Sequence, residues 1–304
     1  MTRSIPLLLF MATAFASARS GAASPVAMSP GGWQSCDGAR LVADPERPRQ
    51  GALFRVAVRG VPSGAELHGK VAGEPLHFER SADGAEALAA APIDASSPLR
   101  IVVTCLVAGR TDSLAMSTPL AVANYPLERL SVAPRFSAPP DSALAARTRR
   151  ESALAAEVSR GSHQTPRLWT EPFRRPREAR VTSVFGSGRE FNGKVTSRHM
   201  GTDYAGAVGA PVHAANRGVV RLVDSFFLGG NVVYIDHGAG MVTAYLHLSA
   251  QDVAVGDTVQ RGDVIGKVGA TGRVTGPHLH WITRYGNVTV DPASLLRMTA
   301  SDQR

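Results

Sequence analysis

Histidines and one aspartate between residues 199 and 280 carry the densest group of reactive side chains in the sequence. The chain holds nine His, and six of them fall in this interval: His199, His213, His237, His247, His278 and His280. Three local patterns stand out: His199-x-x-x-Asp203, Tyr245-Leu246-His247-Leu248 and Gly276-Pro277-His278-Leu279-His280-Trp281. Imidazole nitrogen and carboxylate oxygen are ligands that zinc prefers, so the patterns indicate a metal site.

His278 and His280 lie two residues apart in an apolar context. Because side chains alternate across a β-strand, both imidazoles would project from the same face. One of them can bind a metal while the other contacts water beside it. A catalytic zinc site has three protein ligands and one open position, and His199, Asp203 and one His of this pair would supply three.

The chemistry of such a site is hydrolysis. A zinc ion lowers the pKa of water toward about 7 and polarises a carbonyl, which amide hydrolysis at neutral pH requires. A base must accept the proton of the water and return it to the leaving amine. The His-Glu-x-x-His motif, whose Glu does this in helical metallopeptidases, is absent from the sequence. Imidazoles are then the candidates, and His247 and His278 fit this role.

These residues belong to a longer ordered series. Its main members are Thr182-Ser183-Val184-Phe185-Gly186, His199-Met200-Gly201-Thr202-Asp203-Tyr204-Ala205, Ile235-Asp236-His237-Gly238, Tyr245-Leu246-His247-Leu248 and Thr275-Gly276-Pro277-His278-Leu279-His280. On these motifs the segment from about Val181 to Pro292 closely resembles the catalytic domain of the lysostaphin or LytM type of zinc metallopeptidase.

The resemblance implies both a cofactor and a substrate. It implies that Zn²⁺ is bound by three residues, His199, Asp203 and His280. His247 and His278 would flank the water and stabilise or deprotonate it. The family's fold is a narrow groove between antiparallel sheets, and its members cleave short peptides of peptidoglycan. We therefore expect a zinc metalloendopeptidase whose partners are peptidoglycan stem peptides or cross-bridges.

Two other functions fit the same resemblance. Some family members have lost ligands and activate other wall hydrolases without cleaving anything, but all five site residues are present here. A periplasmic protease acting on ordinary proteins would share the site chemistry, and the side chains that line the groove would distinguish it.

The remaining histidines are assigned no chemistry: His68, His77, His163, His213 and His237. His68 and His77 are expected to stand alone, and His237 lies in a family turn and is interpreted as structural. Asn192, followed by Gly193, predicts a hairpin turn.

The composition predicts the elements that position the site. Thirty Gly, twenty Pro and few aromatic residues favour short strands joined by tight turns. We expect a mainly β fold with a small N-terminal Ig-like β-sandwich over 32–123 and an antiparallel β-groove peptidase domain over 181–295. β-type runs at 53–58, 99–105, 218–223, 231–236 and 241–247 support both. The linker between them, 124–180, should contain a surface helix over about 141–159 with Asp141 as its N-cap.

The first residues and the cysteines indicate the compartment. Arg3, an apolar stretch too short to span a bilayer and Ala16-Ser17-Ala18 predict a signal peptide over 1–18, with residue 23 as the alternative end. The mature chain would be periplasmic, held in the cell envelope or secreted, with no transmembrane segment. In such a compartment Cys36 and Cys105, the only two cysteines, are expected to form a disulfide.

The formal net charge of +8 favours residence on an anionic surface such as a cell wall. No aromatic and basic interleaving or nucleic-acid motif accompanies that charge, so no nucleic-acid partner is expected. We expect a monomer.

Overall fold

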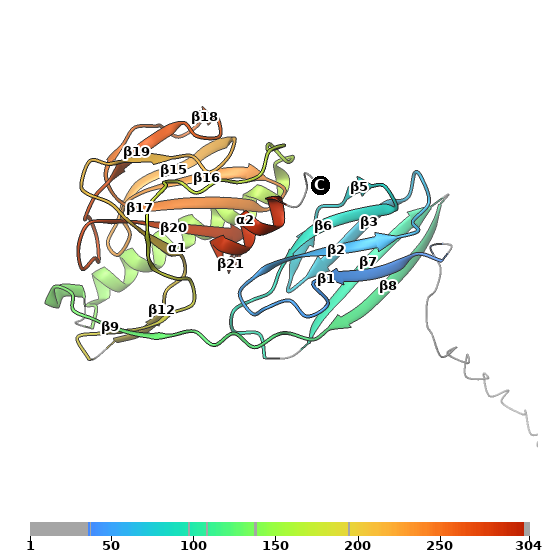
Figure 1. Cartoon of the computed structure of the whole chain (residues 1–304), viewed down its shortest axis with the longest axis horizontal. Helices are drawn as coiled ribbons and strands as arrows, with labels where there is room; N and C mark the ends of the chain where they lie inside the picture. Colours follow the sequence, from blue (N-terminus) through green and yellow to red (C-terminus); the bar gives the residue numbers. More distant parts are fainter. Residues whose placement is uncertain are drawn as a thin grey trace, which may run out of the picture. The chain divides into compact units, whose positions relative to one another are not determined.

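The computed structural model describes residues 36, 38–96, 98–107, 109–136, 139–193 and 195–300. The fold is mainly β, as predicted, with two α-helices among the described residues (Figure 1). The predicted signal peptide, residues 1–18 or 1–23, lies outside the described residues. Among those residues no helix has both the length and the apolar character needed to cross a membrane.

The N-terminal half forms two four-stranded antiparallel sheets, in the orders β1-β2-β6-β5 and β4-β3-β7-β8. Their strands are β1 Arg40–Asp44, β2 Leu53–Arg59, β3 Glu66–Val71, β4 Glu74–Leu76, β5 Glu79–Ser81, β6 Gly84–Ala90, β7 Leu99–Val107 and β8 Arg110–Thr118. The predicted runs at 53–58 and 99–105 correspond to β2 and β7. The two sheets pack face to face through a shared apolar cluster that includes Phe54 and Ile101.

The predicted disulfide is confirmed. Cys36 and Cys105 are bonded across a sequence separation of 69 residues, and both are buried in the core of the sandwich. A loop of that length is expected to stabilise the sandwich by about 4 kcal/mol through the entropy that it removes from the unfolded chain.

The segment between the two halves is more structured than a linker. It contains β9 Leu127–Leu130, the 3₁₀ turns η1 Pro134–Phe136 and η2 Ser162–Gln164, and α1 Ser142–Gly161. Asp141 caps α1 as predicted, because its Oδ1 accepts a hydrogen bond from the backbone N–H of Leu144 at 2.8 Å. α1 lies at the surface, as expected, and buries one side against the C-terminal half. Ala155 of α1 is buried in an apolar cluster formed with Val232, Val242 and other residues of the C-terminal sheet.

The C-terminal half is built on a large antiparallel sheet whose main path runs β10-β13-β20-β17-β16-β15-β18. Its strands are β10 Val181–Ser183, β13 Thr202–Ala205, β14 Pro211–His213, β15 Gly218–Phe226, β16 Gly230–Gly238, β17 Met241–Gln251, β18 Thr258–Val259, β19 Val264–Val268, β20 His278–Tyr285 and β21 Val288–Val290. The runs predicted at 218–223, 231–236 and 241–247 are β15, β16 and β17. In Figure 1, α1 lies along one face of these strands.

A smaller sheet adjoins the large one, in the order β12-β11-β9, with β11 Gly188–Phe191 and β12 Val195–Arg198. β11 and β12 are antiparallel, and Asn192 with a φ of 51° lies in the turn between them, as predicted. β9 pairs parallel with β11, which places Glu128 opposite Arg189. A strand from the expected linker therefore completes this sheet.

The last element of the described residues is α2 Pro292–Ala300, which the sequence analysis did not predict. Leu295 of α2 is fully buried in the apolar cluster of the C-terminal half, which also includes Leu53 of β2. The Oγ of Ser294 accepts a hydrogen bond from the backbone N–H of Leu53 at 2.9 Å.

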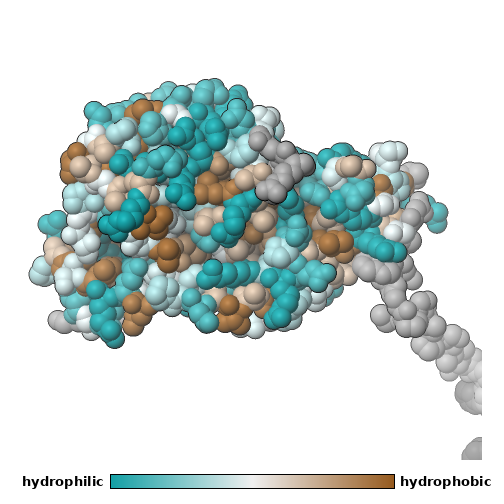
Figure 2. Space-filling view, in the orientation of Figure 1, coloured by the Kyte–Doolittle hydropathy of each residue, from teal (hydrophilic) through white to brown (hydrophobic). Residues whose placement is uncertain are grey.

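On the face drawn in Figure 2, hydrophobic residues lie in small separate groups among hydrophilic ones.

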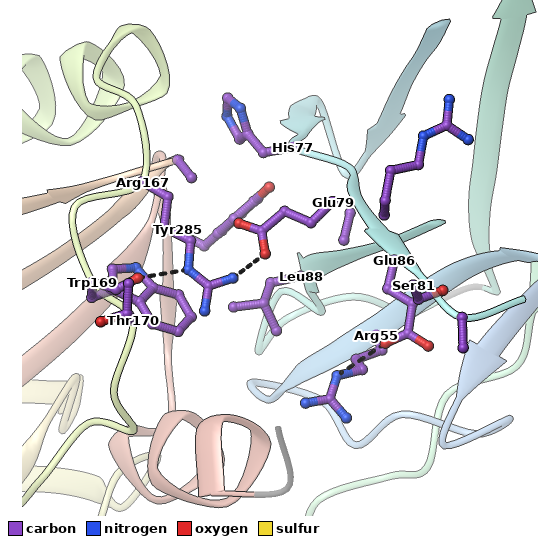
Figure 3. Close-up of a pocket in the computed structure, with 14 residues that line it drawn as sticks. Arg55, His77, Glu79, Ser81, Glu86, Leu88, Arg167, Trp169, Thr170 and Tyr285 are labelled. Atoms are coloured by element: carbon purple, nitrogen blue, oxygen red, sulfur yellow. Dashed lines mark hydrogen bonds and ion pairs between the residues drawn. The ribbon is translucent and has the colours of Figure 1, made fainter. Parts of the chain in front are cut away.

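Residues of β2 and β6 and the segment around residue 169 line a hollow of about 580 Å³ (Figure 3). Two of its arginines pair with carboxylates that also line it. Arg167 forms an ion pair with Glu79 and lies over the Trp169 ring, with 3.5 Å between its guanidinium carbon and the ring centroid, and Arg55 lies 3.8 Å from Glu86.

The expectation that His77 stands alone is wrong. Its Nε2 lies 2.8 Å from Nδ1 of His163, and Nε2 of His163 lies 2.9 Å from Glu74. His68 lies 2.8 Å from Glu66 on the exposed face of β3.

Candidate metal centre

Two adjacent strands bring the aspartate and one histidine of the predicted ligand set together. β13 pairs antiparallel with β20, and in this register Asp203 lies directly opposite His280. His199 precedes β13, and its backbone N–H donates to the carbonyl of Ser187 at 2.8 Å. All three side chains are buried, and their ligand atoms lie within 4.8 Å of one another.

The hydrogen bonds of His199 determine which of its nitrogens faces the cluster. Its Nδ1 lies 2.9 Å from the carbonyl of Val184, so Nδ1 carries the proton and donates it. Nε2 is then unprotonated and presents a lone pair. It lies 2.9 Å from Oδ1 of Asp203 and 2.9 Å from Nδ1 of His280. The lone pair and the carboxylate, two acceptors, point at the same place, which is the arrangement that a bound cation satisfies.

The electrostatics of the cluster favour a carboxylate at Asp203 and a neutral imidazole at His280. Burial raises the pKa of the Asp203 carboxyl, but the close contacts with His199 and His280 outweigh it and hold that pKa well below its usual range. Burial lowers the pKa of His280 to about 4 despite the nearby carboxylate. A carboxylate and neutral imidazoles are the forms that bind a metal. The donor set of two imidazoles and one carboxylate fits zinc.

The other two predicted histidines lie beside the cluster. Nδ1 of His278 donates to the carbonyl of Gly276 at 2.8 Å, and Nε2 of His278 lies 3.7 Å from Oδ1 of Asp203. The ring centroid of His247 is 4.9 Å from that of His278 and 5.8 Å from that of His280. The structure thus brings together all five side chains that the sequence predicted.

A β-bulge directs His247 into the site. The register between β16 and β17 shifts between Asn231 and Val233, and His247 has a φ of 64°, which is rare for a residue with a side chain. Two hydrogen bonds hold this conformation: the backbone N–H of His247 donates to Gly229 at 2.9 Å, and Nδ1 donates to the carbonyl of Thr271 at 2.8 Å. Backbone strain of this kind is concentrated at functional sites.

Behind the cluster lies a polar group that the sequence analysis missed. Nη2 of Arg189 donates to Oδ2 of Asp203 at 2.6 Å, and Nε of Arg189 donates to Glu128 at 3.2 Å. The Oγ of Ser183 donates to Glu128 at 2.7 Å and lies 2.8 Å from Nδ1 of His199. Ser183 lies in the motif Thr182-Ser183-Val184-Phe185-Gly186, but Glu128 comes from the expected linker and no local pattern indicates it.

Gly201 leaves the space that the ring of His280 occupies. A Cβ atom at this position would lie 2.7 Å from Cε1 of His280 and 2.5 Å from the carbonyl oxygen of Trp281. Real Cβ atoms do not approach backbone oxygen so closely, so the motif requires glycine here for close packing rather than for an unusual φ.

Residues of the cluster line two hollows. One, of about 580 Å³, includes Asp203 and His278 in its lining, and the other, of about 180 Å³, includes His199, His247 and His280. Arg189 and Arg273 line both. A peptide lying across the cluster would therefore contact these two arginines.

His237 and His213 lie outside this constellation. His237 is fully buried, its Nδ1 donates to the carbonyl of Arg217 at 2.7 Å, and its Nε2 lies 2.8 Å from Oγ1 of Thr243, which fits the structural interpretation. Burial lowers the pKa of His237 to about 4. Nδ1 of His213 donates to the carbonyl of Gly262 at 2.9 Å.

Comparisons with known proteins agree with this geometry. The sequence pattern described as Peptidase family M23 matches residues 197–292. The peptidoglycan DD-endopeptidase ShyC of Vibrio cholerae is 45% identical over 104 residues, which are 34% of this chain and 24% of that protein. The DD-carboxypeptidase/endopeptidase Mpg of Neisseria meningitidis is 42% identical over 116 residues, 38% of this chain and 27% of that protein. The chain thus spans about a quarter of the length of these curated relatives.

A solved structure extends the similarity beyond the site. A crystal structure of a Pseudomonas aeruginosa protein assigned to peptidase M23 resembles this structure with a TM-score of 0.65 and 27% identity. The match covers 82% of this chain and 95% of that one. The C-terminal part of this chain is therefore a peptidase family M23 domain, homologous to the lysostaphin-type and LytM-type enzymes.

Proposed function

We propose that this chain is an exported zinc metalloendopeptidase that hydrolyses the peptide cross-bridges of bacterial peptidoglycan. One observation carries the proposal: Nε2 of His199, Oδ1 of Asp203 and Nδ1 of His280 converge beside two further imidazoles, within a family M23 domain. The names of the relatives as peptidoglycan endopeptidases support the substrate class. The same names support a place in the cell envelope, where the protein would act as a monomer.

The five side chains divide into two roles. His199, Asp203 and His280 would hold a zinc ion, which would supply the Lewis acidity that activates water and polarises the peptide carbonyl. His247 and His278 each fix Nδ1–H on a backbone carbonyl, so Nε2 presents a lone pair. One of these Nε2 atoms accepts a proton from the attacking water and returns it to the leaving amine, which is general base and then general acid catalysis.

Digestion of purified peptidoglycan by the recombinant mature protein tests the proposal. Mass spectrometry should detect peptides released by cleavage of cross-bridges, and a zinc chelator should abolish their release. Adding zinc back after the chelator is removed should restore it. Glycan chains should keep their length, which distinguishes a peptidase from a glycosidase.

The alternatives give different results in the same experiment. No release of peptides by zinc-loaded protein, together with increased release when a second wall hydrolase is present, would indicate an activator. Cleavage of unfolded proteins but not of any wall preparation would indicate a protease that acts on proteins.

A further inference from the structure

The loop that contains Arg273 is held beside the candidate metal centre by hydrogen bonds and close backbone packing. The backbone N–H of Arg273 donates to the carbonyl of Leu228 at 2.9 Å. Gly272 before it has a φ of 76°, and a Cβ there would lie 2.4 Å from the backbone nitrogen of Gly230. Two residues earlier, the carbonyl of Thr271 accepts the hydrogen bond from His247. The position of Arg273 is therefore set by the backbone that also orients a candidate catalytic residue.

The side chain of Arg273 is held against an aromatic ring. Its guanidinium carbon lies 4.2 Å from the ring centroid of Phe191, which is buried at the end of β11. The side chain of Arg273 is half-buried and lines both hollows that flank the metal centre. It is thus held in place beside the candidate metal centre, on the surface of both hollows.

Arg273 has no anionic partner among the described residues, although its neighbour does. Arg189 forms ion pairs with Glu128 and Asp203, whereas no carboxylate of the described residues lies within 4.0 Å of Arg273. Burial, and then repulsion from Arg189, lower the pKa of the Arg273 guanidinium. A partly buried cation without a counter-charge is unfavourable unless a ligand supplies one.

The geometry points to a carboxylate site: Arg273 binds a free carboxylate of the substrate peptide, next to the amide that is cleaved. The inference rests on the proposed function and specifies its substrate class. A planar guanidinium binds a carboxylate through two parallel hydrogen bonds, which fixes orientation as well as charge. The enzyme should therefore prefer cross-bridges that carry a carboxylate beside the scissile amide over uncharged bridges made of glycine.

Two synthetic peptides that differ in one group test this inference. Both contain the same scissile amide, and the neighbouring group is a free carboxylate in one peptide and a carboxamide in the other. The zinc-loaded protein and an Arg273→Gln variant are compared on both peptides by kcat/KM. The dissociation constants for both are also measured in a His247→Ala background, in which cleavage is suppressed.

We expect the wild type to prefer the carboxylate peptide. Arg273→Gln should lower kcat/KM for that peptide by about 10- to 100-fold, the typical effect of losing a hydrogen bond between charged groups. It should change kcat/KM for the carboxamide peptide by less than about threefold. The loss should appear mainly in KM and in the dissociation constant. Arg150→Gln removes the same charge from the exposed face of α1 and should leave kcat/KM unchanged for both peptides.

The outcomes separate this inference from the proposed function. The carboxylate site would be overturned if the wild type had equal kcat/KM for both peptides. It would also be overturned if Arg273→Gln lost kcat/KM equally on both peptides while its zinc content and melting temperature were unchanged. If the wild type cleaves neither peptide and no wall preparation, the proposed function fails. Tighter binding of the carboxylate peptide, lost in Arg273→Gln, would still support the site in that case, and equal binding would overturn it.

Discussion

Nη2 of Arg189 lies 2.6 Å from Oδ2 of Asp203, so this arginine holds the carboxylate oxygen that faces away from the paired contacts with His199 and His280. The other oxygen, Oδ1, lies 2.9 Å from Nε2 of His199 and 2.7 Å from Nδ1 of His280. Oδ1 of Asp203 thus faces the proposed metal site, whereas Oδ2 is bound by Arg189. Groups that hold a metal ligand in this way determine its orientation and affinity.

Replacing Arg189 should therefore weaken zinc binding without removing a ligand. In Arg189→Gln the Asp203 carboxylate loses its charged partner and becomes free to rotate, and we expect the zinc dissociation constant to rise about 10- to 100-fold. Competition with a chromophoric chelator measures this constant. Arg129→Gln, which removes a largely exposed arginine 3.8 Å from Glu190, should leave it unchanged. An unchanged constant in Arg189→Gln would show that Asp203 is oriented by its strand alone.

Removing a proposed ligand and removing a proposed base should have different effects. His280→Ala should lose both zinc and activity, because only two ligands remain. His247→Ala should keep most of its zinc and lose about 10²- to 10⁴-fold in kcat, the usual contribution of general acid–base catalysis. Metal analysis of the purified variants and the rate of peptide release measure the two effects. Equal loss of zinc in His247→Ala would mean that the roles are assigned wrongly.

Adding one methyl group at Gly201 should disturb the site. The Cβ of Gly201→Ala would lie 2.7 Å from the ring of His280 and 2.5 Å from a backbone oxygen, so the ring or the strand must move. Overpacking of this kind costs about 1–3 kcal/mol, and we expect a lower melting temperature and reduced zinc content. Gly276→Ala is the matched control, because nothing lies within 4 Å of its added Cβ. Equal behaviour of the two variants would contradict this packing argument.

Stability should fall as the pH is lowered below about 6.5, in part because of His237. Burial lowers the pKa of His237 from 6.5 to about 4, so the unfolded chain binds a proton in this range and the folded chain does not. The free energy of unfolding therefore decreases as pH falls from 6.5 to 4, by on the order of 3 kcal/mol from this residue. Guanidinium unfolding of the zinc-loaded protein at several pH values measures it. In His237→Gln the slope between these pH values should be shallower, and an identical slope would contradict the prediction.

Much of this protein follows from local sequence patterns. The mainly β fold, the β-runs, the Asp141 cap and the hairpin turn at Asn192 depend on alternation and on turn chemistry, which act over a few residues. The disulfide follows from the presence of only two cysteines. The five candidate site residues could be named because each lies in a short motif and their order along the chain is informative.

Tertiary structure alone decided how these residues are supported. Glu128 reaches Arg189 because a strand from the expected linker pairs with β11, and no propensity predicts that pairing across 61 residues. His247 faces the cluster because of a bulge, which changes the face on which a side chain lies. Among the residues that the structure describes, Arg273 has no acidic partner, because the folded loop places it away from their carboxylates. The sequence by itself thus identifies the reactive groups, whereas their partners, protonation and orientation depend on register and packing between distant segments.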